Sequence, residues 1–488
     1  MRDKRNKIMS DHTIEKIGGT SMSDYPSVRD NIIFSRKKKT SFYQRVFVVS
    51  AYAGITDKLL EHKKSGKPGV YALFSSAFED RSWLQALADL KQEMLEINGR
   101  LFSDAPMLVK ANEFISERIV EAEQCLTGLH SICLHGHFSL DQHLQTVREM
   151  LASLGEAHSA WNMTQLLQLD GVNAIYVDLT GWNTDRHISL DQRIEEAFNN
   201  IDLQSQLPVV TGYAHAESGL MSSFDRGYSE MTFSRLAVIT HAQEAIIHKE
   251  FHLSSADPKL VGEDMAVPIG RTNYDVADQL ANLGMEAIHP RAAKGLRQHG
   301  IPLRVKNTYE PDHAGTLITG EYVSHTPCVE IIAGCRGVYA LEVFDQDMAG
   351  NSYDYDRSIV EVIKRFGARI VSKDVNANTI THYLDTNIKT VRRIRKELEK
   401  RYPESEVDQQ KVAIVAAIGS DMQIPGILAK AVSAVAEAGV SVLAIHQSMR
   451  QVDMQFIVNE SDYTETIRSL HSALVEVHDH GHAICIAC

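Results

Sequence analysis

The chain has 488 residues, of which 44% are hydrophobic and 23% charged, and its formal net charge is −13. At roughly 150 residues per domain, this length predicts about three domains. The composition excludes a largely disordered protein, and the negative charge argues against a nucleic-acid binder, which needs a basic surface. No apolar run approaches the roughly 18 residues that span a bilayer, and the N-terminus lacks the apolar stretch of a secretory signal. We therefore expect a soluble cytoplasmic protein with no nucleic-acid or membrane partner.

Six cysteines are too few for a disulfide scaffold, which agrees with a reducing compartment. Cys485 and Cys488 form a C-x-x-C pattern after His478, His480 and His482, and such a cluster could hold a transition metal. No second half-site follows at zinc-finger spacing, so a polar tail is the favoured interpretation. We predict no metal site.

Residues 12–320 alternate apolar runs with amphipathic stretches. The runs 46–49, 172–177 and 207–210 are typical of parallel strands that are covered on both faces. Helical stretches between such strands predict an α/β fold with helices on both sides of a mostly parallel sheet.

From about residue 335 a different module appears, and it appears twice. Each copy is expected to contain a strand, a helix, two strands and a second helix: 337–343, 359–367, 368–372, 379–384 and 389–401, then 412–416, 425–439, 441–445, 454–458 and 465–474. Two such units of nearly equal length are an internal repeat. The charged stretch 402–410, which contains Pro403, is the predicted linker.

A candidate phosphate-binding segment follows the first strand, where the sequence reads Lys16-Ile17-Gly18-Gly19-Thr20-Ser21. Glycines let backbone N–H groups approach phosphate oxygens, and a lysine supplies a point charge. The segment is not a Walker A loop, because the lysine precedes the glycines. Taken alone, it fits a tight strand-to-helix turn equally well.

Two later segments also place polar residues at the start of a helix. Residues 50–57 read Ser-Ala-Tyr-Ala-Gly-Ile-Thr-Asp after an apolar run, and residues 224–230 read Phe-Asp-Arg-Gly-Tyr-Ser-Glu before another predicted helix. Arg226, in the second segment, offers a planar fork for a carboxylate.

In this order the segments resemble aspartate kinase, a member of the amino-acid kinase family that carries tandem ACT domains. The resemblance covers residues 13–477 and rests on the Lys-x-Gly-Gly-Thr-Ser and Ser-Ala-x-Ala-Gly-Ile-Thr motifs together with the repeat. It implies a three-layer αβα sandwich with a mostly parallel sheet at 12–320. It also implies two ferredoxin-like ACT domains at 335–402 and 411–478, with flexible tails at 1–11 and 479–488.

The family transfers the γ-phosphoryl group of ATP to the β-carboxylate of L-aspartate, with Mg²⁺, and gives 4-phospho-L-aspartate. This is the first step toward aspartate semialdehyde. The acceptor is already ionised at neutral pH, so no general base is required. Catalysis is expected to consist of positioning and of electrostatic neutralisation.

The resemblance also implies site residues. Lys16 and Arg226 would be catalytic, Lys16 at the transferring phosphoryl group and Arg226 at the α-carboxylate of aspartate. The expected nucleotide contacts are Lys16, Gly18, Gly19, Thr20, Asp257 and Lys259. The expected substrate contacts are Thr56, Glu117, Arg226, Ser229 and Glu230. Glu117 would meet the substrate ammonium, although a first-turn helix glutamate is an equally good interpretation.

Several positions depart from the family pattern. In the usual Gly-Arg-Gly-Gly-Ser-Asp motif, Tyr228 replaces a glycine and Glu230 replaces the aspartate. On the nucleotide side only Asp257-Pro258 survives in 248–259, and Glu286 replaces a lysine. Such a change should weaken triphosphate binding unless a nearby cation, at Lys249, Lys259 or Arg291, compensates.

The ACT pair implies an amino-acid effector and a homodimer or higher oligomer. The segments where an effector would bind also depart from the family pattern, which leaves its identity open. In this respect the chain is similar to the aspartate kinases that serve ectoine biosynthesis. One alternative is a non-catalytic, amino-acid-binding regulatory pseudokinase. A kinase for another acid, such as glutamate, ranks last, because the longer Glu230 side chain would narrow the pocket.

Overall fold

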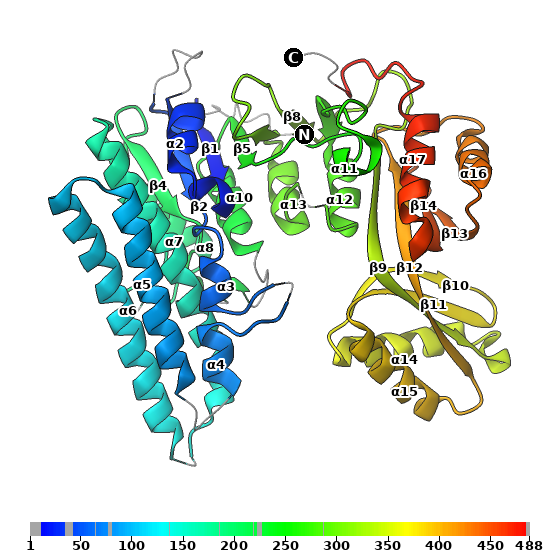
Figure 1. The fold of residues 1–488 in the computed structure, drawn as a ribbon, viewed down its shortest axis with the longest axis horizontal. Helices are drawn as coiled ribbons and strands as arrows, with labels where there is room; N and C mark the ends of the chain where they lie inside the picture. Colours follow the sequence, from blue (N-terminus) through cyan, green and yellow to red (C-terminus); the bar gives the residue numbers. More distant parts are fainter. Residues whose placement is uncertain are drawn as a thin grey trace, which may run out of the picture. The chain divides into compact units, whose positions relative to one another are not determined.

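The structure is a computed structural model that describes residues 11–34, 42–63, 65–76, 81–135, 137–184, 186–217, 219–221, 227–285 and 287–484. The chain forms two compact units (Figure 1), which are described one at a time. Unit 1 comprises Met1–His252 and Ile288–Gly320, and unit 2 comprises Leu253–Ala287 and Glu321–Cys488. Among the described residues, no helix combines the length and the apolar character needed to cross a bilayer.

Unit 1 is built on a sheet with the strand order β3-β4-β2-β1-β5-β7-β8. The neighbouring strands are parallel, except that β8 runs antiparallel to β7. The strands are β1 (Thr13–Ile17), β2 (Arg45–Val49), β3 (Ala174–Val177), β4 (Leu207–Thr211), β5 (Glu244–Lys249), β7 (Leu303–Asn307) and β8 (Thr316–Thr319). The apolar runs in β2 and β4 are buried, as expected for strands that are covered on both faces.

Helices cover this sheet. Helix α7 packs on β2, β3 and β4, and α10 packs on β1, β2 and β5. The helices of the unit are α1 (Gly19–Met22), α2 (Tyr25–Ser27), a π-helix (Val28–Ile33), α3 (Ile55–Leu59), α4 (Val70–Ser76), α5 (Ser82–Leu101), α6 (Ala105–Cys133), a 3₁₀ turn (Leu140–Gln142), α7 (Leu144–Leu169), α8 (Leu190–Phe198), α10 (Tyr228–Ile239) and α13 (Pro290–His299). The predicted α/β sandwich is confirmed.

Parallel register brings the carboxyl ends of the central strands to one edge of the sheet. Ile17 at the end of β1 pairs with Val49 of β2 and with His248 of β5. Val49 in turn pairs with Thr211, the last residue of β4. The segments that follow these strands, far apart in sequence, therefore meet at this edge.

Unit 2 contains a six-stranded sheet with the order β10-β11-β9-β12-β14-β13. Its strands are β6 (Arg271–Asn273), outside that sheet, and β9 (Ile331–Phe344), β10 (Arg369–Val375), β11 (Thr379–Asp385), β12 (Glu406–Ile418), β13 (Val442–Gln447) and β14 (Asp453–Asn459). Its helices are α11 (Pro258–Val261), α12 (Tyr274–Asn282), a 3₁₀ turn (Gln346–Met348), α14 (Ser352–Arg365), α15 (Ile388–Arg401), α16 (Ile427–Glu437), a second 3₁₀ turn (Glu460–Asp462) and α17 (Tyr463–Leu474). The predicted repeat of strand, helix, two strands and helix is present in both copies.

The two central strands of this sheet each serve both copies. β9 pairs with β11 through residues 338–344 and with β12 along its whole length, while β12 pairs with β14 through residues 412–418. The linker predicted at 402–410 is wrong in its second half, because β12 already begins at Glu406. Val407 is the first buried residue of β12. Its neighbours on both sides are charged or polar, so the sequence lacks the apolar pattern that predicts a strand.

Residues 479–484, expected to form part of a flexible tail, pack against unit 2. Ile484 forms a β-bridge with Ile269, the backbone N–H of Gly270 donates to the carbonyl of Ala483 at 3.0 Å, and Ala483 is fully buried. The expectation was wrong because the short apolar pair 483–484 carries the contact. Cys485 and Cys488 lie outside the described residues.

Candidate active site

Lys16 is the last residue but one of β1, beside the sheet edge just described, and is 8% exposed. The loop after it turns directly into α1, which begins at Gly19. A Cβ atom on Gly19 would lie 2.4 Å from the carbonyl oxygen of Ala51, so only glycine fits this contact. The two turns that follow β1 and β2 are thus packed backbone to backbone beside the lysine.

Glu230 is the acidic partner of Lys16. Its Oε1 lies 3.5 Å from Lys16 Nζ, and its Oε2 accepts a hydrogen bond from the backbone N–H of His289. Burial raises the pKa of Glu230, but the charges of Lys16 and Lys249 outweigh it and hold the pKa below its ordinary value. Glu230, which is longer than the aspartate of the family motif, is therefore ionised where it contacts Lys16.

Glu156 of α7 is a second buried carboxylate on the same side. It is 2% exposed, and its Oε1 accepts a hydrogen bond from the hydroxyl of Tyr228 at 2.9 Å. Its Oε2 is buried and makes no hydrogen bond of good geometry among the described residues. Burial raises the pKa of Glu156 to about 7, although the Tyr228 hydroxyl, the Ala51 backbone and the Lys16 charge each lower it.

Glycines make room for this carboxylate. A Cβ on Gly212, which follows β4, would lie 2.9 Å from the Cβ of Ser229 and 3.2 Å from the Cγ of Glu156. A Cβ on Gly155 would lie 2.6 Å from the Cβ of Ala51. Glu156 and Ser229 therefore converge on the turns after β2 and β4.

Glu117 does not join this cluster. It lies in the middle of α6, rather than at a helix start, and its side chain is exposed, while α6 packs on α5 and α7. The expectation that Glu117 opens a helix is therefore wrong. The buried glutamate is Glu156, which the sequence analysis missed. A signal existed, because residues 151–160 are small or apolar on every side of the helix except at Glu156 and His158.

The remaining predicted substrate residues divide into described and undescribed ones. Ser229 is 7% exposed, and its Oγ lies 3.4 Å from the Oγ of Ser50. Thr56 is half-buried in the first turn of α3, after Gly54 at a φ of 82°. Thr20 is exposed in α1. Arg226 and Glu286 lie outside the described residues.

The predicted nucleotide residues lie in both units. Gly18 and Gly19 flank the start of α1 in unit 1. Asp257 and Lys259 lie in unit 2, where Asp257 caps α11 by accepting the backbone N–H of Lys259 at 2.9 Å. Of the compensating cations named from the sequence, Lys249 at the end of β5 is one whose charge lowers the pKa of Glu230.

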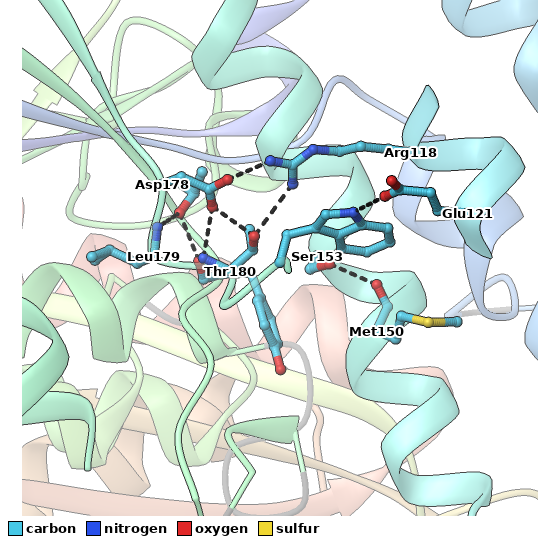
Figure 2. Close-up of polar contacts among 10 residues, drawn as sticks. Arg118, Glu121, Met150, Ser153, Asp178, Leu179 and Thr180 are labelled. Carbon is cyan, nitrogen blue, oxygen red and sulfur yellow. Dashed lines mark hydrogen bonds and ion pairs between the residues drawn. The ribbon is translucent and has the colours of Figure 1, made fainter. Parts of the chain in front are cut away.

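A cavity of about 340 Å³ lies between α6, α7 and the loop after β3, and Tyr213, Trp182 and Thr180 line it. Figure 2 shows the contacts beside Thr180, where Arg118 of α6 points toward Asp178 and Thr180. Arg118 pairs with Asp178 and donates to the Thr180 hydroxyl at 3.3 Å. These contacts tie α6 to the loop after β3.

Comparison with known proteins agrees with this arrangement. A model of the amino acid kinase family matches residues 12–307, and an ACT domain model matches residues 415–474. The chain is 54% identical to the aspartate kinase Ask_Ect of Stutzerimonas stutzeri, over 98% of this chain and 100% of that protein.

Two solved structures of Escherichia coli aspartokinase III share the fold at 20% identity. The complex with lysine and aspartate gives a TM-score of 0.72 over 95% of this chain, and the complex with aspartate and ADP gives 0.69 over 96%; both cover 100% of the bacterial chain. The family match, the high identity over the full length and the shared fold together place this chain in the amino acid kinase family, among the aspartate kinases.

Proposed function

We propose that this chain transfers the γ-phosphoryl group of ATP to the β-carboxylate of L-aspartate. One observation carries the proposal: Lys16 and the buried carboxylate of Glu156 stand at the same edge of the sheet, so a cation for the phosphoryl group and an anion for an ammonium group are offered together. An amino acid that is also a phosphoryl acceptor requires both.

The reaction sets an anion against a polyanion, so its main difficulty is charge. Lys16 and the backbone N–H groups of 18–20 would neutralise charge on the transferring group. Glu156 would bind the α-ammonium of aspartate, in the role first expected for Glu117. Arg226 remains our proposed partner for the α-carboxylate, with Thr56 and Ser229 beside the substrate. Glu230 would keep Lys16 charged and in place.

For the nucleotide we propose MgATP as the substrate, with contacts from Gly18, Gly19, Thr20, Asp257 and Lys259. Lys249 is proposed as the cation that offsets Glu286. We assign the catalytic domain to 12–320 and the two ACT domains to 335–402 and 411–478, and residues 406–410 of β12 join them by pairing with residues 340–344 of β9.

We further propose a homodimer or higher oligomer, an amino-acid effector at the ACT domains and a cytoplasmic location, where ATP and aspartate are available. The name of the Stutzerimonas relative supports a role in the ectoine pathway. The 54% identity to an aspartate kinase favours catalysis over the pseudokinase alternative.

The test is hydroxamate trapping of the acyl phosphate with ATP, Mg²⁺ and L-aspartate, beside Lys16→Ala and with L-glutamate in place of aspartate. We expect a signal that depends on aspartate and is lost in the variant. A well-folded wild-type protein with no signal would reject the proposal, and an equal signal with L-glutamate would reject the substrate.

A further inference from the structure

The family motif has a glycine at the position of Tyr228. The hydroxyl of Tyr228 donates a hydrogen bond to Glu156. Tyr228 is the first residue of α10, and Ser229 and Glu230 follow it in the same turn. The ring is 2% exposed. Gly227 before it is held against His289, because a Cβ at Gly227 would lie 2.7 Å from the Cδ2 of that ring. The start of the helix that carries Tyr228 is therefore packed closely against His289.

Helix α7 carries two glutamates that each accept a tyrosine hydroxyl, and their surroundings differ. Glu149 and Glu156 are seven residues apart, so they lie on one face two turns from each other. Tyr213 donates to Glu149 at 2.7 Å and Tyr228 donates to Glu156 at 2.9 Å. The two rings pack edge to face, with their centroids 5.5 Å apart.

The carboxylate of Glu149 is saturated by the protein. Besides Tyr213, it accepts the backbone N–H of Met221 at 2.8 Å and the side-chain amide of Gln145 at 3.0 Å. Glu156 differs, because one oxygen is bound by Tyr228, while Oε2 is buried without a hydrogen bond of good geometry among the described residues, and the Ala51 backbone is a further donor near the carboxylate. A buried carboxylate oxygen without a hydrogen-bond donor carries a desolvation penalty. A ligand that donates a hydrogen bond to this oxygen would remove that penalty.

We propose that Tyr228 is a positioning residue for the amino-acid site: by binding Oε1 of Glu156, it directs Oε2 toward the α-ammonium group of the substrate. This inference rests on the proposed function. The hydroxyl of Tyr228 holds the Glu156 side chain in one rotamer. A glycine at position 228 would offer no such contact. The arrangement of Tyr228 and Glu156 also selects for a ligand with a hydrogen-bond donor at that point, because an acid that lacks the ammonium leaves Oε2 unsatisfied.

The electrostatic surroundings agree with this role. The charged and titratable groups that face Glu156 are Tyr228 from α10, Lys16 from β1 and Tyr213 from the segment after β4. Burial raises the pKa of Glu156 to about 7, and the Tyr228 hydroxyl opposes that rise. Removing the hydroxyl should therefore raise the pKa further and reduce the ionised fraction at neutral pH.

The test compares Tyr228→Phe with Tyr213→Phe, a matched control that removes a hydroxyl from Glu149 instead. In Tyr228→Phe we expect the KM for aspartate to rise about tenfold, as for the loss of one hydrogen bond to a charged group, with kcat and the KM for ATP within twofold. The acid limb of kcat/KM for aspartate should move to higher pH. In Tyr213→Phe that limb should stay in place.

The outcomes separate the two proposals. If the wild-type enzyme does not phosphorylate aspartate, the proposed function fails. If it does, but Tyr228→Phe keeps the wild-type KM and acid limb, the role of Tyr228 is overturned. Should Tyr228→Phe not fold, 3-fluorotyrosine at position 228 keeps the ring and strengthens the donor. The acid limb should then move to lower pH, and an unmoved limb would overturn the inference.

Discussion

Lys16 Nζ lies 3.5 Å from Oε1 of Glu230, and the second oxygen of that carboxylate accepts the backbone N–H of His289. One side chain thus connects β1, α10 and α13, which are far apart in the sequence. The family motif has an aspartate here, and the extra methylene of Glu230 is used to reach the lysine. The ion pair fixes Lys16, the cation that we propose neutralises the transferring phosphoryl group.

Replacing this carboxylate should therefore cost both stability and activity. For Glu230→Gln we expect a loss of about 2 kcal/mol in the free energy of unfolding at pH 7, since a buried charged hydrogen bond is weakened. Because the folded pKa of Glu230 is lowered, its contribution is present above the unfolded pKa and is lost as pH falls through the folded pKa. Urea unfolding of both proteins at pH 7 and pH 4 should show the difference shrinking at the lower pH. A constant difference would contradict this assignment.

Glu156 should behave in the opposite sense. Its folded pKa of about 7 lies above the ordinary value of 4.5, so its contribution is greatest below pH 4.5 and declines until about pH 7. At about 1.4 kcal/mol per pKa unit, the decline is at most about 3.5 kcal/mol. Glu156→Gln should gain stability over the wild type at pH 8 and little at pH 5, while it loses affinity for aspartate. Melting temperatures at the two pH values, with aspartate titrations beside them, are the measurement. Equal effects at both values would show that Glu156 is already ionised.

Gly19→Ala should abolish turnover through sterics alone. The new methyl group would meet the Ala51 carbonyl at 2.4 Å, and two backbone segments beside Lys16 would have to separate. We expect at least a hundredfold loss of kcat. The matched control is Gly99→Ala in α5, where a Cβ has no neighbour within 4 Å and where alanine should stabilise the helix by up to about 1 kcal/mol. Melting temperature and hydroxamate yield distinguish the two, and an active Gly19→Ala enzyme would show that the turns move apart freely.

Lys249→Met should weaken nucleotide binding if this lysine offsets the glutamate at position 286. We expect the KM for ATP to rise about tenfold with little change in the KM for aspartate, because one charge-assisted contact to phosphate is lost. Lys110→Met, at an exposed position on α6, is the control for loss of positive charge. An unchanged KM for ATP would remove Lys249 from the nucleotide site and leave Lys259 or Arg291 as the compensating cation.

Most of the fold followed from local patterns. The strands β2 and β4 were predictable because they are covered on both faces, which requires apolar residues at every position. The helices of unit 2 were predictable from their ends, for example Gly439 at a φ of 75° just after α16. The start of β12 was not, because Val407 is its only buried residue before Val412.

The site was predictable only in part. The motif around Lys16 is contiguous, so its residues are read together from the chain. Glu156 is separated from Lys16 by the long helices α5 and α6, and its partner Tyr228 lies 72 positions further on. Only the sheet edge brings them together. Glu117 and Glu156 are both glutamates within helices, and burial alone separates them.

The shared strands β9 and β12 have a consequence for how unit 2 opens. Each strand forms hydrogen bonds with strands of both copies of the repeat. Neither copy therefore forms a complete sheet without the other. Unfolding of one copy would break the backbone hydrogen bonds that its central strand makes with the other copy. The two copies should therefore unfold as one cooperative unit. Amide protons in β9 and β12 should exchange with solvent together, at one rate, in place of two rates for two independent domains.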